Sequence, residues 1–170
     1  TESIVRARAA MRPAKIETTV ARQGTPVSFN RRFLLKDGSV KTWANFRDPS
    51  VVRSAGPIDP EVGFVLVRDA EKKTPLMTLT NFALHLDTVG GALWSADYPY
   101  WIEQSLREQL GSDLVSIFGT GCCGNINHVD PSREERNDTK TIGSALARTV
   151  IAELPRLQPV ESPTLHVRSA

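Results

Sequence analysis

The chain is poor in cysteine and lacks long apolar runs, and each shortage excludes a class of protein. Only two cysteines occur among 170 residues, Cys122 and Cys123, and adjacent cysteines seldom pair because the geometry between neighbours is strained. A disulfide-stapled fold is therefore excluded. Apolar runs such as Phe64–Val67 suit a buried strand and are far shorter than the roughly 18 residues that a membrane span needs. We expect no transmembrane segment.

The chain also lacks a strong excess of either charge. Lys and Arg number 21 against 19 Asp and Glu, which gives a net charge of +2. With 40% hydrophobic and 24% charged residues, the composition is that of a soluble globular protein and excludes intrinsic disorder. The small positive excess is spread along the sequence, so we expect no nucleic-acid partner.

The N-terminal residues show no secretion signal. Arg6, Arg8 and Arg12 occur there, but no apolar core of a signal peptide accompanies them. The sequence opens on Thr1 without an initiator Met, which suggests a processed protein or a piece of a longer one. The residues alone leave localisation open.

Apolar periodicity predicts a mixture of helices and strands. Strands are expected over 15–22, 61–68, 76–85 and 114–118, and helices over 3–11, 98–110 and 138–154. Asp97 and Gly111 fit the two caps of the middle helix, whereas 30–60 is expected to be a long loop or a short hairpin around 36–38. A further strand-like piece covers 164–168. This order predicts an α/β fold, a mixed β-sheet with flanking helices, in one domain over 1–170 or in a portion of a larger one.

Two His-x-Asp pairs follow predicted strands. His85 stands at the end of one strand and precedes Asp87, while His128 precedes Asp130 beyond the last strand. An Asp two residues from a His can orient the imidazole or ligate a metal itself, so these positions are candidates for metal binding or proton transfer. The alternative is structural: a hydrogen-bonded histidine, and Asp side chains that bond local backbone in turns.

The second pair follows a glycine-rich loop, Gly119–His128. Glycines permit positive φ angles and let backbone N–H groups approach a ligand, as in anion nests and oxyanion holes. The loop lacks the Gly-Lys-Ser/Thr ending of a phosphate-binding loop and does not open a helix, so nucleotide binding is not expected. Cys122 or Cys123 is either a nucleophile beside a histidine or, as we favour, a small buried thiol.

Several segments, taken together, resemble the N-terminal catalytic domain of the neutral/alkaline, non-lysosomal ceramidases. The similarity covers about 30–154 and is greatest to divergent bacterial members. The matching segments, in the family's order, are Asn30–Arg32, Ile58–Glu61, Thr80–His85, Ser95–Asp97 and Phe118–His128. That family consists of zinc-dependent amidases that hydrolyse the N-acyl bond of ceramide. The resemblance implies one zinc ion held by His85, with Arg31, Gly121 and Gly124 at the substrate.

The sequence departs from the family at two points. Asn127 replaces the catalytic serine of the family's Ser-Pro-Asn, and Asn cannot act as that nucleophile. The family's other zinc ligands have no counterpart here, so the resemblance implies that the remainder of a larger catalytic domain is a partner of these residues. Hydrolysis without the serine would use zinc-activated water, with His128 or Asp130 carrying the proton and Asn127 donating to the carbonyl.

Three functions remain open from the sequence. The leading hypothesis is a zinc-dependent hydrolase of ceramide or another small-molecule or lipid N-acyl substrate, secreted or periplasmic as the resemblance implies. The second is a non-catalytic binding or scaffold domain that lost the serine, and the third is a cysteine-dependent hydrolase. A groove for lipid chains could be lined by aromatic residues near the middle helix, namely Trp94, Tyr98, Tyr100 and Trp101, although Tyr98 also fits the core face.

Overall fold

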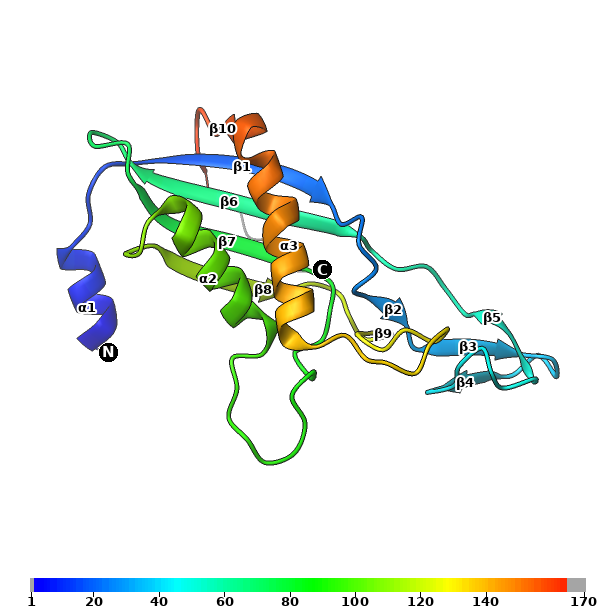
Figure 1. The fold of residues 1–170 in the computed structure, drawn as a ribbon. Helices are drawn as coiled ribbons and strands as arrows, with labels where there is room; N and C mark the ends of the chain where they lie inside the picture. Colours follow the sequence, from blue (N-terminus) through cyan, green and yellow to red (C-terminus); the bar gives the residue numbers. More distant parts are fainter. Residues whose placement is uncertain (1, 165–170) are drawn as a thin grey trace.

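A mixed sheet forms the centre of the computed structural model, which describes residues 2–164 (Figure 1). The strands in spatial order are β10 (Gln158–Pro159), β1 (Ala14–Arg22), β6 (Glu61–Asp69), β7 (Pro75–Phe82) and β8 (Val115–Thr120). Neighbouring strands are antiparallel except for β7 and β8, which run parallel. Parallel neighbours need a crossover, and the helix between them supplies it. The predicted α/β fold with a mixed sheet is confirmed.

The helices α2 (Tyr98–Leu110) and α3 (Thr139–Glu153) pack on one face of this sheet (Figure 1). The carboxylate of Asp97 caps α2 by accepting from the Tyr98 N–H, as predicted, and Gly111 with φ 120° ends the helix. Asp138 caps α3 in the same way through the Thr141 N–H. The short helix η1 (Leu154–Arg156) follows α3, and α1 (Glu2–Ala9) lies away from the sheet and buries no residue.

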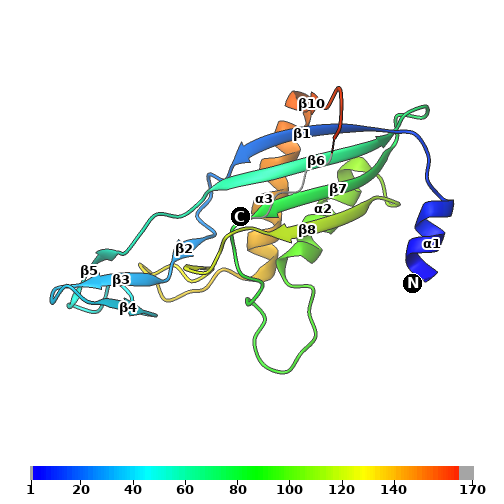
Figure 2. The same ribbon diagram turned by 180° about the vertical axis from the view of Figure 1, so that it is seen from behind.

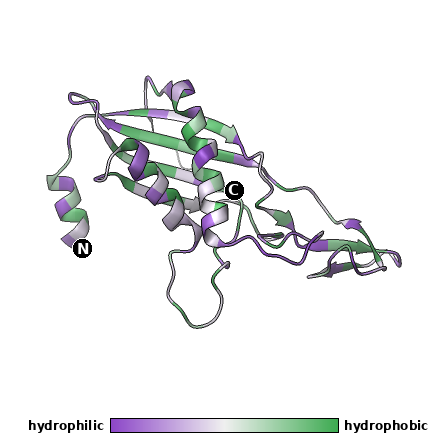
Figure 3. Ribbon diagram, in the orientation of Figure 1, coloured by the Kyte–Doolittle hydropathy of each residue, from purple (hydrophilic) through white to green (hydrophobic). Residues whose placement is uncertain are grey.

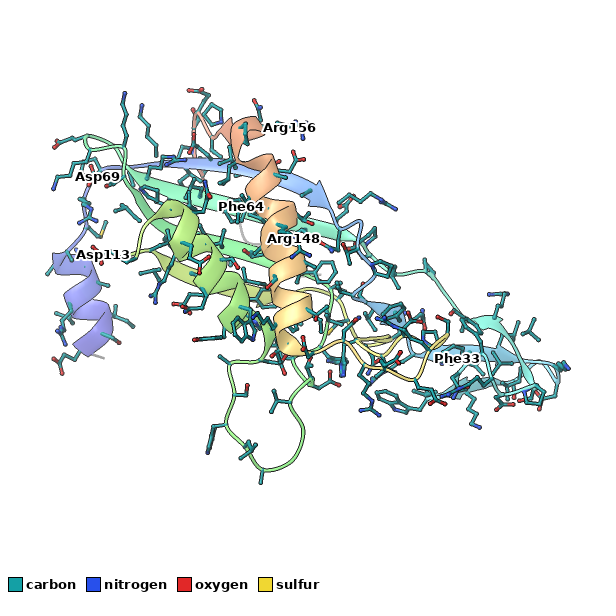
Figure 4. All side chains as sticks on the ribbon, in the orientation of Figure 1. Phe33, Phe64, Asp69, Asp113, Arg148 and Arg156 are labelled. Carbon is teal, nitrogen blue, oxygen red and sulfur yellow. The ribbon has the colours of Figure 1, made fainter. Side chains whose placement is uncertain are left out.

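The core lies between the sheet and these two helices. Strands β6 and β7 present every second side chain to the helices, as the period of a half-covered strand requires. Fully buried members are Phe64 (labelled in Figure 4), Leu66 and Phe82 from the sheet, Ile102 and Leu106 from α2, and Ile142, Leu146 and Val150 from α3. Tyr98 is also fully buried and bonds the Leu84 carbonyl at 2.8 Å. Tyr98 is therefore a core residue, and the prediction that it lines a groove is wrong.

The other face of the main sheet, seen in Figure 2, is apolar but carries neither α2 nor α3. The register places Ile16, Val67, Met77 and Val115 in one row across β1, β6, β7 and β8. Val115 is 54% exposed. Figure 3, which colours each residue by hydropathy, shows that β6 and β7 are largely hydrophobic along their length. No helix within 2–164 is long and apolar enough to cross a membrane.

Two small sheets extend from the end of the main sheet (Figures 1 and 2). Strand β2 (Phe29–Asn30) pairs with β9 (Ile126–Asn127), and β3 (Arg32–Leu35) pairs with both β4 (Val40–Thr42) and β5 (Val51–Ser54). The expected hairpin around 36–38 is present between β3 and β4. The rest of 30–60 is more ordered than predicted because β5 returns to pair with β3. The strand-like piece expected over 164–168 lies almost wholly outside the described residues.

Candidate functional site

The candidate site lies where β7 and β8 end. Because these two strands run parallel, the segments that follow them leave the sheet at the same edge. His85 follows β7 by three residues, because the strand ends at Phe82 and not at residue 85 as predicted. Cys123 and His128 follow β8 in the same manner. The topology thus gathers both His-x-Asp segments and the glycine-rich loop in one place.

His85 contacts Cys123 across this edge. The distance between His85 Nδ1 and Cys123 Sγ is 3.4 Å. The other ring nitrogen of His85, Nε2, is buried and has no hydrogen-bond partner. Burial raises the pKa of the Cys123 thiol, so the neutral thiol is the favoured form. A buried ring nitrogen without a partner is an unsatisfied polar group, which is the state expected of a nitrogen that binds something else.

His128 pairs with Asp87 and not with the neighbouring Asp130. Its Nδ1 lies 3.2 Å from Asp87 Oδ1, and the His128 side chain is only 5% exposed. A carboxylate in this position makes Nδ1 the protonated nitrogen and leaves Nε2 as a proton acceptor. Asp87 of the first His-x-Asp pair therefore serves His128 of the second, whereas Asp130 does not contact His85.

Asp130 and Asn127 make local contacts. Asp130 accepts hydrogen bonds from the backbone N–H and the hydroxyl of Ser132 and pairs with Arg133 at 3.2 Å. Although burial opposes it, the Ser132 hydrogen bonds lower the pKa of Asp130 below its usual value. Asn127 is 2% exposed, and its Oδ1 accepts from the Val129 N–H. The side-chain NH₂ of Asn127 is thus the part of this residue that remains to donate to a ligand.

Two glycines of the loop, Gly119 and Gly121, serve packing in this structure. A Cβ at Gly121 would lie 3.2 Å from the Ala83 backbone, and the Gly121 N–H donates to the Phe82 carbonyl. This N–H is therefore not available to a substrate oxyanion. No glycine of Gly119–His128 adopts a positive φ, and the Gly124 carbonyl accepts from Arg31 at 2.8 Å. Close packing explains Gly119 and Gly121 without a ligand, whereas a Cβ at Gly124 would meet no atom within 4 Å.

Arg31 stands beside the loop because β2 pairs with β9. Its guanidinium donates to Gly124 and lies 5.1 Å from the ring centroid of Trp43. Trp43 has a positive φ of 66°, a conformation that costs an L-residue about 1–3 kcal/mol and that clusters at ligand-binding sites. Arg31 and Trp43 thus contact one another and line one cavity together with Asn127.

Comparisons with solved structures bear on this arrangement. Over 89% of its length, the chain superposes on neutral ceramidase from Pseudomonas aeruginosa with a TM-score of 0.62 and 20% sequence identity, covering 24% of that chain. A second structure, a ceramidase complexed with C2, gives a TM-score of 0.62 at 18% identity, with 87% and 23% of the two chains covered. The fold is ceramidase-like. No protein-family model and no curated protein sequence matches the chain.

The ceramidase-like fold here corresponds to about a quarter of each ceramidase chain. Within residues 2–164, no group of three or more His, Cys, Asp or Glu side chains is placed to hold a metal ion. His85 can offer one nitrogen through its unpartnered Nε2. The described residues can therefore supply one ligand to a metal ion, the His85 imidazole.

Sequence reasoning missed several residues around this edge of the ceramidase-like fold. Asp87 was paired with His85 and not with His128, Trp43 carried no assigned role, and Arg47, Arg133 and Arg136 are spread along the sequence. The structure brings these arginines to one cavity with Arg31, although they are spread along the sequence. No local pattern could have shown this, because the arginines come from segments that are distant in sequence.

Proposed function

We propose that the chain is part of a zinc-dependent amide hydrolase that cleaves the N-acyl bond of ceramide or a related lipid. The ceramidase-like fold supports this proposal, and the His85 imidazole is the observation that carries it. That side chain lies at the edge where β7 and β8 end, with a buried Nε2 that no protein group satisfies. The other zinc ligands would come from the remainder of the catalytic domain.

Cys123 would act as a positioning residue for His85. If Nδ1 of His85 carries the ring proton and points it at Sγ, 3.4 Å away, Nε2 presents its lone pair to the metal. Zinc, when bound, would polarise an amide carbonyl and lower the pKa of a coordinated water. This role for the thiol requires no thiolate, in agreement with the raised pKa of Cys123. The cysteine-dependent hydrolase is disfavoured for the same reason.

His128 would carry the proton during hydrolysis. With Asp87 holding Nδ1–H, its Nε2 accepts a proton from the attacking water and returns it to the amine that leaves. The products are then a carboxylic acid, which releases its proton to water at neutral pH, and an amine, and His128 ends in its initial state. Asn127 would donate its NH₂ to the carbonyl oxygen, and Asp130 is a second candidate for proton transfer.

The test measures zinc content and hydrolysis separately, in the longest form of the protein that can be purified. We expect about one zinc per chain in the wild type and in His128→Ala, and its loss in His85→Ala. Hydrolysis, assayed with a fluorescent ceramide and with N-octanoylglycine, should fall at least about 100-fold in His128→Ala across pH 5 to 9. Unchanged hydrolysis in that variant would remove the proton-transfer role, and equal zinc in wild type and His85→Ala would remove the metal site.

Cys123→Val tests the positioning role. Losing the partner of a ligating histidine typically weakens metal affinity about 10- to 100-fold, so zinc should be removed by a weaker chelator than in the wild type. The exposed neighbour gives a matched control, since Cys122→Ala should retain zinc like the wild type. Equal affinities in the two variants would contradict the role of Cys123.

A non-catalytic binding or scaffold domain is the second candidate, and one observation favours it. Asn127, which stands at the family's serine position, is 2% exposed and has its carbonyl oxygen occupied by the Val129 N–H. Such a residue suits a structural turn. A folded protein that contains no zinc and hydrolyses no N-acyl substrate would support this candidate.

A further inference from the structure

A cavity of about 290 Å³ opens beside Asn127, between β3 and the segment 129–136. Its wall includes Asn30, Phe33, Trp43 and Asn127, and Phe33 is labelled in Figure 4. Asn127 connects this cavity to the candidate site, because it lines the wall and directly precedes His128. A ligand in the cavity would therefore reach the residue that replaces the family's serine.

Arginines dominate the charge of this wall. Four arginines line the cavity, Arg31, Arg47, Arg133 and Arg136, against two carboxylates, Asp130 and Glu134. Arg47 pairs with Glu134 and Arg133 with Asp130, so two positive charges remain in excess.

The two arginines that have no acidic partner can bind a ligand at least cost. Arg31 is fixed by the Gly124 carbonyl and by its contact with the Trp43 ring, and neither contact neutralises it. Arg136 is exposed and makes no side-chain hydrogen bond or ion pair with any residue in 2–164. Guanidinium groups bind carboxylates and phosphates through paired N–H donors, and a fixed guanidinium loses little entropy when it does so.

The size of the cavity adds a second constraint. At about 290 Å³ it lies at the lower limit for small-molecule sites and admits a compact polar group. The two long chains of a ceramide do not fit in this volume. Ceramide also carries no anionic group, so it would leave both excess charges without a partner.

We propose that this cavity binds an anionic oxygen group, carboxylate or phosphate, on a small N-acyl compound. This inference rests on the proposed amide hydrolase and narrows its substrate from ceramide itself to a related N-acyl compound whose acidic group lies close to the amide, as in an N-acyl amino acid. Asn127 then faces the amide while Arg31 and Arg136 hold the charge. The hydrolysis product on this side is an amine that bears the same acidic group.

The binding test uses the full chain and isothermal titration calorimetry, with three probes that share one acyl chain. N-octanoylglycine carries a carboxylate, N-octanoyl-O-phosphoethanolamine carries a phosphate, and N-octanoylglycinamide is the neutral control. At least one anionic probe should bind about tenfold more tightly than the neutral amide, which corresponds to about 1.4 kcal/mol. The tighter of the two identifies which acidic group the cavity takes.

Variants locate the site. Arg136→Gln should weaken binding of the preferred anion about fivefold and leave the neutral probe unchanged, since an exposed ion pair contributes about 1 kcal/mol. Arg148→Gln is the matched control, because Arg148 is exposed on α3 and lies away from Phe33 in Figure 4. Binding in this control should equal the wild type.

Three results would overturn the inference: no binding of either anion at millimolar concentration, equal binding of charged and neutral probes, or equal effects of the two variants. The calorimetry needs neither zinc nor turnover. A chain that binds the anion selectively but lacks zinc and hydrolysis would therefore refute the proposed function alone.

Discussion

Gly143→Ala is the substitution for which the structure predicts a clear loss of stability. A Cβ at this position of α3 would lie 2.4 Å from the Tyr98 carbonyl oxygen and 2.6 Å from Trp101 Cβ on α2. Real Cβ atoms essentially never approach another atom within 3.0 Å. Because the Tyr98 oxygen belongs to the backbone, no side-chain rotation relieves the contact, and the two helices must separate.

The size of the effect follows from two opposing contributions. Overpacking a well-packed contact costs about 1–3 kcal/mol, and this one lies at or above the upper end because backbone must move. Ala is a better helix former than Gly by about 1 kcal/mol, which offsets part of that cost. We expect a net loss of about 2 kcal/mol in the free energy of unfolding. For a chain of this length, such a loss lowers Tm by about 4–8 °C.

Urea denaturation followed by circular dichroism measures this loss. Gly24→Ala is the matched control, since no atom lies within 4 Å of the added Cβ and its φ is not positive. The control should stay within about 0.5 kcal/mol of the wild type. If Gly143→Ala unfolds at the same or a higher urea concentration than the wild type, the close packing of α2 on α3 is not as described.

Other changes test the core, a helix cap and the thiols. Thr80→Val should raise the free energy of unfolding by about 1 kcal/mol in the same urea assay, because the buried Thr80 hydroxyl has no hydrogen-bond partner. A lower free energy of unfolding in this variant would mean that the hydroxyl has a partner. Asp138→Ala should lower it by about 1 kcal/mol at neutral pH. The hydrogen bond from the Thr141 N–H lowers the pKa of Asp138. This stabilisation is therefore complete at pH values above the ordinary pKa of Asp and is lost as the pH falls through the lowered pKa. An equal difference in the free energy of unfolding between variant and wild type at pH 7 and at pH 2 would contradict this. Iodoacetamide should modify exposed Cys122 before buried Cys123 in the folded protein, as mass spectrometry of the peptides would show, and the reverse order would be inconsistent with burial of Cys123.

The sequence predicts the local features of this fold well. The α2 helix, its Asp97 cap and its Gly111 end follow from propensity and capping rules that act within a few residues. The strands β6 and β7 follow from apolar runs bounded by polar turns. The strand β5 was not predicted, because it forms by pairing with β3, which is distant in sequence, and its own apolar pattern is weak.

The candidate site shows the limit of such prediction. His85 and His128 were identified from their positions after strands, and the resemblance to ceramidases added Arg31. Their partners were not predictable, since His128 finds Asp87 41 residues away and His85 finds Cys123 38 residues away. The parallel pairing of β7 and β8 decides these contacts, and no local pattern encodes it.

The short pairing of β2 with β9 has a consequence for how the site opens and closes. Only two residue pairs join these strands, yet they hold Arg31 against Gly124, which is 93 residues away along the chain. A ladder this short opens at a small free energy, because few hydrogen bonds and little buried surface are lost. We expect amide hydrogens such as the Arg31 N–H to exchange with solvent while those of β6 stay protected. The arginine cavity and Asn127 would then assemble and come apart together without unfolding of the main sheet.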